Sequence, residues 1–128
     1  MDRSEIVHRN FLTRAKAGDW PDLASPVSLA RSGLAPETLT EIFHSQVLSR
    51  HLDRVSRQLQ ARGVGYYTIG SSGHEGNAAL ATAFRPTDMA FLHYRDAAFQ
   101  IARARQVPGE TPLWDMLLSF VTSSEDPI

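Results

Sequence analysis

The chain has no cysteine, a single lysine and no long apolar run. Without cysteine there can be no disulfide, no thiolate catalysis, and no thiolate zinc or iron–sulfur site. The single lysine, Lys16, is followed by Ala17, which excludes the phosphate-binding loop that ends in Gly-Lys-Ser/Thr. No stretch approaches the roughly 18 consecutive apolar residues of a membrane span, and the polar N-terminus does not resemble a signal sequence. We therefore expect a soluble, cytoplasmic protein with no membrane partner.

Positive and negative charges are balanced, with 13 Lys and Arg against 14 Asp and Glu and a net charge of -1 over 128 residues. Proteins that bind nucleic acid usually carry excess positive charge, so we expect no nucleic-acid partner. Four arginines nevertheless gather near the end of one predicted helix: Arg50, Arg54, Arg57 and Arg62. The favoured interpretation is a solvated helix side or a subunit contact, with nucleic-acid binding as a distant alternative.

The clearest helix signal covers residues 36–62. Pro36 suits a first helical position and Gly63 suits a stop. Apolar residues fall between them at helical spacing and predict one buried stripe: Leu39, Ile42, Phe43, Val47, Leu48, Leu52, Val55 and Leu59. On the same helix, Asp53 and Arg57 have the spacing of a surface ion pair.

The rest of the chain predicts an α/β fold that is mostly helical, with one or two short strands. Residues 1–35 have little periodicity and read as an extended N-terminal arm, distinct from a domain at 36–128. The β-prone run 64–69 precedes a glycine loop at 70–73 and a small-residue helix over 74–84. A buried strand is expected at 89–93. Two further helices are expected, one from 94–96 to 107 and one that begins at Thr111 and Pro112.

His74 and Glu75 follow the glycine loop and invite comparison with metal sites. The metalloprotease pattern needs a second histidine where Ala78 stands, so a zinc site of that type is excluded. Ser72 and Glu75 have the spacing of a capping box, which makes a structural role for Glu75 the favoured interpretation. The imidazole of His74 can either reach a ligand or bond locally, and the sequence leaves both readings open.

Tyr94 and Arg95 are placed where the predicted strand ends and a helix begins. A permanent positive charge beside the free N–H groups of a helix start suits an anion of phosphate size. Asp96 could cap the same helix. A structural salt bridge from Arg95 to Asp88 or Asp96 explains the spacing equally well. The Gly-x-Gly-x-x-Gly dinucleotide fingerprint and the Gly-x-Ser-x-Gly nucleophile elbow do not occur.

Three segments in order carry a family resemblance, namely 67–76 (YTIGSSGHEG), 85–88 (RPTD) and 91–96 (FLHYRD). Together they resemble the N-terminal, α-type part of the E1 component of thiamine-diphosphate-dependent 2-oxo acid dehydrogenases, the branched-chain (2-oxoisovalerate) type in particular. The likeness is strongest over residues 64–106. It implies that Tyr94 and Arg95 bind the cofactor's diphosphate, and that Tyr67, Ser72 and His74 contribute to the substrate pocket.

The chain departs from the family in its catalytic centre. The Gly-Asp-Gly motif that leads to the Mg²⁺ ligands is missing, because Gly18-Asp19 is followed by Trp20. The glutamate of the β-type half is missing as well. The resemblance therefore implies no catalytic residue and no metal ligand here, with thiamine diphosphate and Mg²⁺ held in the complete enzyme.

From this resemblance we expect an E1 fragment that is inactive alone, cut short at Ile128. The complete oxidoreductase would decarboxylate a branched-chain or related 2-oxo acid and transfer the acyl group to a lipoyl carrier. Its partners would be the remainder of the α-type domain, a β-type half or subunit, and a lipoyl-bearing acyltransferase, in a homo- or hetero-oligomer. The alternative is a stand-alone helical module for interaction or dimerisation through residues 37–62, without catalysis.

Overall fold

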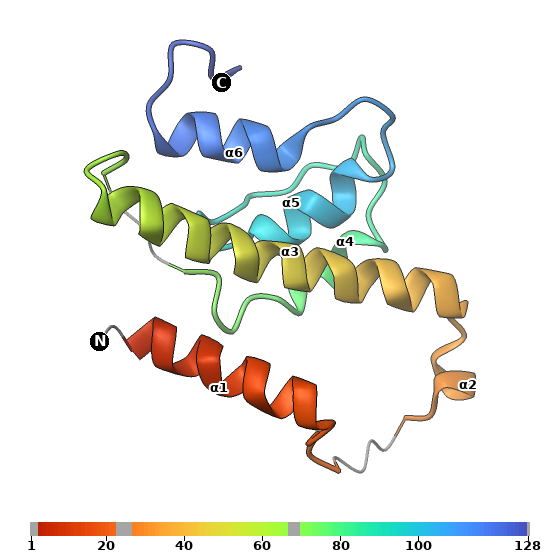
Figure 1. The fold of residues 1–128 in the computed structure, drawn as a ribbon. Coiled ribbons are helices and arrows are strands. Elements are labelled where there is room, and N and C mark those ends of the chain that lie inside the picture. The colour runs from red at the N-terminus through yellow and green to blue at the C-terminus, as the bar shows by residue number, and fades with distance from the viewer. Residues whose placement is uncertain (1–2, 23–26, 67–69, 128) are drawn as a thin grey trace. The chain divides into compact units, whose positions relative to one another are not determined.

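A computed structural model describes residues 3–22, 27–66 and 70–127, and the chain divides into two compact units, Met1–Leu34 and Ala35–Ile128. The first unit contains α1 (Arg3–Ala17) and α2 (Leu29–Ser32). The second contains α3 (Pro36–Ala61), α4 (Asn77–Ala81), α5 (Ala97–Ala104) and α6 (Pro112–Phe120), as Figure 1 shows. The fold is mostly helical. No helix of the described ranges has both the length and the apolar character needed to cross a membrane.

The extended arm expected for residues 1–35 is wrong over α1, which is a helix of 15 residues. Local contacts explain the difference. The helix stops at Gly18, where φ is 65°, and the following residues turn back on it. The Trp20 ring centroid lies 6.2 Å from that of Phe11, and Asp19 accepts a hydrogen bond of 3.0 Å from Arg14 Nε.

The long helix predicted over 36–62 is confirmed as α3, with Pro36 in its first turn. Its end follows from Gly63, which has φ 75° and donates its N–H to the Gln60 carbonyl. The expected apolar stripe is buried in part, because Phe43 is 62% exposed and Val55 41%, whereas Ile42 is buried and the other members are half-buried: Leu39, Val47, Leu48, Leu52 and Leu59. Besides Ile42, the residues of α3 that are buried are small: Ser45, Ser49 and Ser56.

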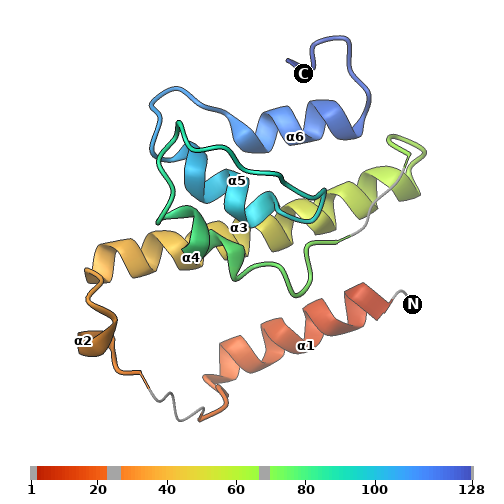
Figure 2. The same ribbon diagram turned by 180° about the vertical axis from the view of Figure 1, so that it is seen from behind.

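Small side chains on facing helices explain that difference. The short helices α4 and α5 pack on α3 and on each other, as the view from behind in Figure 2 shows. Ala78 and Ala98 are fully buried at these contacts, and Phe99 meets Phe84 edge to face at 5.6 Å between ring centroids. Close helix approach therefore accounts for the buried serines on this face of α3.

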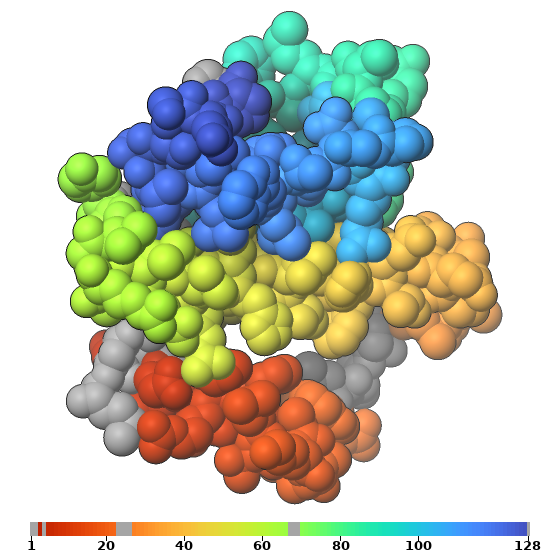
Figure 3. Space-filling model, turned by 45° about the horizontal axis from the view of Figure 1, so that its top comes forward, coloured from red at the N-terminus to blue at the C-terminus, as the bar shows by residue number. Residues whose placement is uncertain are grey.

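α6 lies against both α5 and α3, and the space-filling view in Figure 3 shows it (blue) on the surface of α3 (yellow to green). It begins at Pro112 as predicted. The residues expected to point inward are half-buried: Leu113, Met116, Leu117, Phe120 and Val121.

No strand is found in the described ranges, so the short strand expected at 89–93 is not formed. A strand needs a paired neighbour, and the His93 N–H donates instead to the Asp96 carboxylate at 2.8 Å. Phe91 is 95% exposed, so the segment is not buried either. Of the β-prone run 64–69, the first three residues are not a strand, and residues 67–69 lie outside the described part.

Candidate functional site

In the structure the glycine loop at 70–73 continues through hydrogen-bonded turns to residue 76, and from here on the name covers residues 70–76. This loop meets the segment 93–96 that precedes α5. Arg95 joins them: its Nε donates to the Gly70 carbonyl at 3.0 Å, and its Nη2 donates to the Ser72 carbonyl at 3.4 Å. The structure thus brings together Ser72 and Arg95, two of the residues that sequence analysis singled out. Ser72 takes part through its backbone.

Arg95 has no carboxylate within 4 Å in the part of the chain that the structure describes. Both expected partners are engaged elsewhere. Asp88 pairs with Arg85 at 2.7 Å, and this hydrogen-bonded pair lowers the pKa of the Asp88 carboxyl. Asp96 accepts from the Asn77 side chain. The expected salt bridge is therefore not made, and the guanidinium bonds two backbone carbonyls instead.

Asp96 organises the other side of the loop. Its carboxylate accepts from Asn77 Nδ2 at 2.6 Å and from the His93 N–H at 2.8 Å, and it lies 3.6 Å from His74 Nδ1. Burial acts to raise the pKa of Asp96, but these hydrogen bonds and the nearby His74 outweigh it and hold the pKa below its ordinary value. Asp96 occupies the N-cap position of α5, but its side chain makes no capping hydrogen bond to the first turn.

Glu75 closes the glycine loop rather than capping a helix, so the expected capping box is wrong. α4 begins only at Asn77, since residues 71–76 form hydrogen-bonded turns. The Glu75 carboxylate accepts from the Gly73 N–H at 2.8 Å and lies 3.4 Å from Arg50 Nε on α3. Its role is still structural, as expected, but it ties the loop to α3.

Tyr94 stands beside the loop with an exposed side chain. Its ring centroid lies 3.7 Å from that of His93, which in turn is 6.3 Å from that of His74. Tyr94 also lines a groove of about 920 Å³ between α3, α5, α6 and the segment before α5. Tyr67, the remaining predicted substrate residue, lies outside the described residues.

A buried polar network on α3 was not predicted from the sequence. Asp53 accepts from the Ser71 N–H at 2.8 Å, from Ser71 Oγ at 2.9 Å and from Arg50 Nη1 at 2.9 Å. Ser49 Oγ donates to Ser71 Oγ at 2.7 Å, and both serines are buried. Asp53 had been expected to pair with Arg57, so its bonds to the glycine loop were not predicted. The spacing of Ser45, Ser49 and Ser56, which places them on the same helical face as Ile42, could have indicated a buried polar face.

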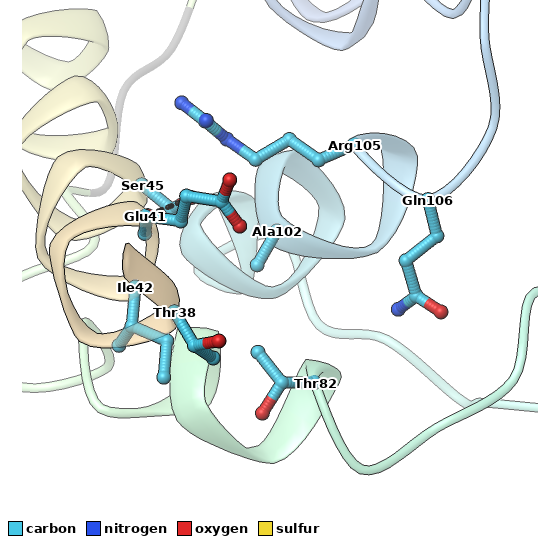
Figure 4. A pocket seen from close by; sticks show the side chains of 8 residues that line it. All are labelled: Thr38, Glu41, Ile42, Ser45, Thr82, Ala102, Arg105 and Gln106. Atoms are coloured by element: carbon cyan, nitrogen blue, oxygen red, sulfur yellow. Dashed lines mark hydrogen bonds between the residues drawn. The ribbon is translucent and has the colours of Figure 1, made fainter. Parts of the chain in front are cut away.

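A second, smaller pocket of about 280 Å³ lies between α3, α4 and α5, away from these residues (Figure 4). Arg105, at its rim, contacts His44 Nδ1. The pocket is lined by Thr38, Glu41, Ile42, Ser45, Thr82, Ala102, Arg105 and Gln106. It contains none of the residues that the motifs pointed to.

The arrangement around Arg95 suits an anion better than a metal ion. Over the described ranges, no group of three or more His, Cys, Asp or Glu side chains is placed to hold a metal. A guanidinium that makes no direct ion pair and lies beside a helix start can bind a phosphate-like group. Comparison with protein-family models, curated protein sequences and solved structures finds no match for this chain.

Proposed function

We propose that this chain forms one edge of the cofactor site in a cytoplasmic E1 component of a thiamine-diphosphate-dependent 2-oxo acid dehydrogenase, as the N-terminal part of the α-type polypeptide. One observation carries the proposal: two of the motif segments converge on Arg95, which bonds the loop carbonyls and pairs with no carboxylate among the described residues. The complete enzyme oxidatively decarboxylates a branched-chain or related 2-oxo acid and passes the acyl group to a lipoyl carrier.

The residues around Arg95 fit the diphosphate end of the cofactor. A guanidinium has five N–H donors, and Arg95 uses two of them on the loop carbonyls, so others are free for phosphate oxygens. The first turn of α5 adds backbone N–H groups that the side chain of Asp96 does not cap. Tyr94 lies next to Arg95 and is open to a ligand. When bound, the cofactor supplies the carbanion chemistry of the reaction.

His74 and Ser72 are assigned to the substrate side of the same site, together with Tyr67. The support for His74 is its place beside the ionised Asp96, which orients the imidazole electrostatically. The Mg²⁺ ligands and the catalytic glutamate are assigned to the remainder of the α-type domain and to a β-type half. We therefore expect this chain to be inactive by itself.

The test is Arg95→Ala in the natural full-length enzyme. Loss of a charge-assisted, forked contact should raise the thiamine diphosphate concentration needed for half-maximal activity roughly 30-fold, about 2 kcal/mol. Arg105→Ala is the matched control, because Arg105 lies at the separate pocket of Figure 4. Equal cofactor requirements for both variants and the wild type would contradict the proposal.

A second candidate function is a helical interaction module without catalysis. The observation that favours it is the exposure of two large apolar side chains of α3, Phe43 and Val55. On this hypothesis the chain self-associates or binds a partner helix through α3. Sedimentation of the wild type and of Phe43→Glu distinguishes the candidates: a concentration-dependent mass that the substitution abolishes supports the module, and a monomer at all concentrations argues against dimerisation.

A further inference from the structure

One peptide unit of the glycine loop is held at both of its ends. The bond between Gly70 and Ser71 is trans, so its C=O and N–H point in opposite directions. The Ser71 N–H donates to both carboxylate oxygens of Asp53, at 2.8 and 3.0 Å. The Gly70 C=O accepts from Arg95 Nε at 3.0 Å. A carboxylate and a guanidinium are thus linked through a single amide group.

The two charges reinforce each other through this amide. An anion at the N–H and a cation at the C=O polarise the peptide in the same sense, which strengthens both hydrogen bonds. Screening by water is weak, because the Asp53 side chain is 14% exposed and Ser71 is buried. Gly70 fits closely here, since an added Cβ would lie 3.1 Å from Asp53 Oδ2.

Asp53 is also held firmly in place on α3. Arg50 Nη1 and Ser71 Oγ both donate to its Oδ2, at 2.9 Å each. Ser49, one helical turn earlier, fixes Ser71 Oγ from the other side. The position of the Gly70 carbonyl is therefore fixed relative to α3. The direction of the Arg95 guanidinium, which bonds this carbonyl, is fixed with it.

We propose that Asp53 is a positioning residue for the anion site: it fixes the Gly70–Ser71 peptide, and this peptide orients Arg95 toward the cofactor's diphosphate. Asp53 acts through Arg95 and does not itself contact the ligand. The inference rests on the proposed function for the identity of the anion, whereas the coupling of Asp53 to Arg95 can be measured in this chain alone.

The first experiment follows the Arg95 Nε–H by NMR in the isolated chain. Asp53→Asn keeps the side-chain size and removes the charge and one acceptor oxygen. We expect hydrogen exchange of the Arg95 Nε–H to accelerate about tenfold, equivalent to about 1.4 kcal/mol. Asp88→Asn, which alters a carboxylate engaged by Arg85, is the control and should leave that rate unchanged. An unaltered exchange rate in Asp53→Asn overturns the inference.

The second experiment is a double-mutant cycle in the natural full-length enzyme, with thiamine diphosphate and Mg²⁺ as the probe. Asp53→Asn should weaken cofactor binding about tenfold in the wild type and have no further effect when Arg95 is already alanine. Equal effects in both backgrounds, or no effect in either while Arg95→Ala alone weakens binding, overturn the inference.

The two proposals fail in different ways. If Arg95→Ala leaves cofactor affinity unchanged, the proposed function fails, and the exchange rate of the Arg95 Nε–H still decides whether Asp53 positions Arg95. If Asp53→Asn does not fold, Ser71→Ala replaces it in both experiments, because it removes the hydroxyl bond to Asp53 and keeps the backbone one. The expected change is then about threefold, and its absence counts against the inference.

Discussion

Replacement of Asp96 by asparagine tests how the site is held together. The carboxylate receives two N–H donors, from His93 at 2.8 Å and from Asn77 at 2.6 Å, and the side chain is 13% exposed. Asparagine offers one oxygen in place of two, so one donor would face an NH₂ group. A hydrogen bond to a charged group contributes about 1.5 to 3 kcal/mol. We therefore expect Asp96→Asn to lower the free energy of unfolding by about 2 kcal/mol at pH 7.

This loss should depend on pH in a defined direction. Burial alone would raise the pKa of Asp96, but the hydrogen bonds from the His93 amide and from Asn77 hold it below its value in the unfolded chain. The carboxylate therefore contributes stability above the unfolded pKa, and this contribution is lost as pH falls through the folded pKa. The difference between wild type and Asp96→Asn should be constant near neutrality and shrink below about pH 4.

Urea unfolding followed by circular dichroism at pH 7, 5 and 3 measures the difference directly. Asp88→Asn is a useful comparison because its carboxylate also bonds an N–H donor and an arginine, but at an exposed turn. A stability difference for Asp96→Asn that is as large at pH 3 as at pH 7 would refute the reasoning, since the ionised carboxylate would then not be its source.

Three further substitutions test the packing of the second unit by the same urea assay. Phe99→Ala removes the largest buried ring and should lower the free energy of unfolding by about 3 to 4 kcal/mol; a loss below 1 kcal/mol would mean that the ring is not packed as described. Gly65→Ala should lower it by about 2 to 3 kcal/mol, because φ is +91° and an added Cβ would lie 2.1 Å from Phe120 Cε1; wild-type stability would show that α6 does not dock there. Ala98→Leu should lower it by about 2 kcal/mol through overpacking between α4 and α5, and a stabilised variant would reveal a void at this contact.

Local signals made α3 predictable, but they did not show that serines would be among its most deeply buried residues. Pro36 and Gly63 mark the ends of the helix whatever surrounds it. The buried side depends on which partner packs there, and the partners are short helices rich in alanine. Such partners favour the serine face, and they leave Phe43 on the outside. Tertiary contact thus changed which residues of α3 are most deeply buried, while most of the predicted stripe is at least half-buried.

The helix of the first unit, α1, was not predicted from the sequence at all. α1 has weak apolar periodicity, so its sequence favours no buried face. Two side-chain contacts at its end join residues close in sequence, namely the Arg14–Asp19 ion pair and the contact of Phe11 with Trp20. Such short-range pairs are visible in the sequence only once the turn at Gly18 is known.

The convergence on Arg95 was partly predictable and partly not. The order of the motifs indicated that the glycine loop and the segment before α5 belong to one site. Spacing alone could not distinguish a salt bridge of Arg95 from an anion site, because the competing donors to Asp88 and Asp96 are set by turn geometry. The role of Asp53 could not be predicted from spacing either, because its partner Ser71 is 18 residues away and meets it only in the folded chain.

The serine-lined face of α3 has a thermodynamic consequence. Ser45 and Ser49 are fully buried yet bring almost no hydrocarbon out of water, and the alanines opposite them bring little more. Both the heat-capacity change and the denaturant dependence of unfolding scale with the surface newly exposed to solvent. The second unit should therefore unfold with a shallow urea slope and a broad calorimetric transition for its length. Its stability would then depend more on hydrogen-bonded turns and close backbone contact than on a hydrophobic core.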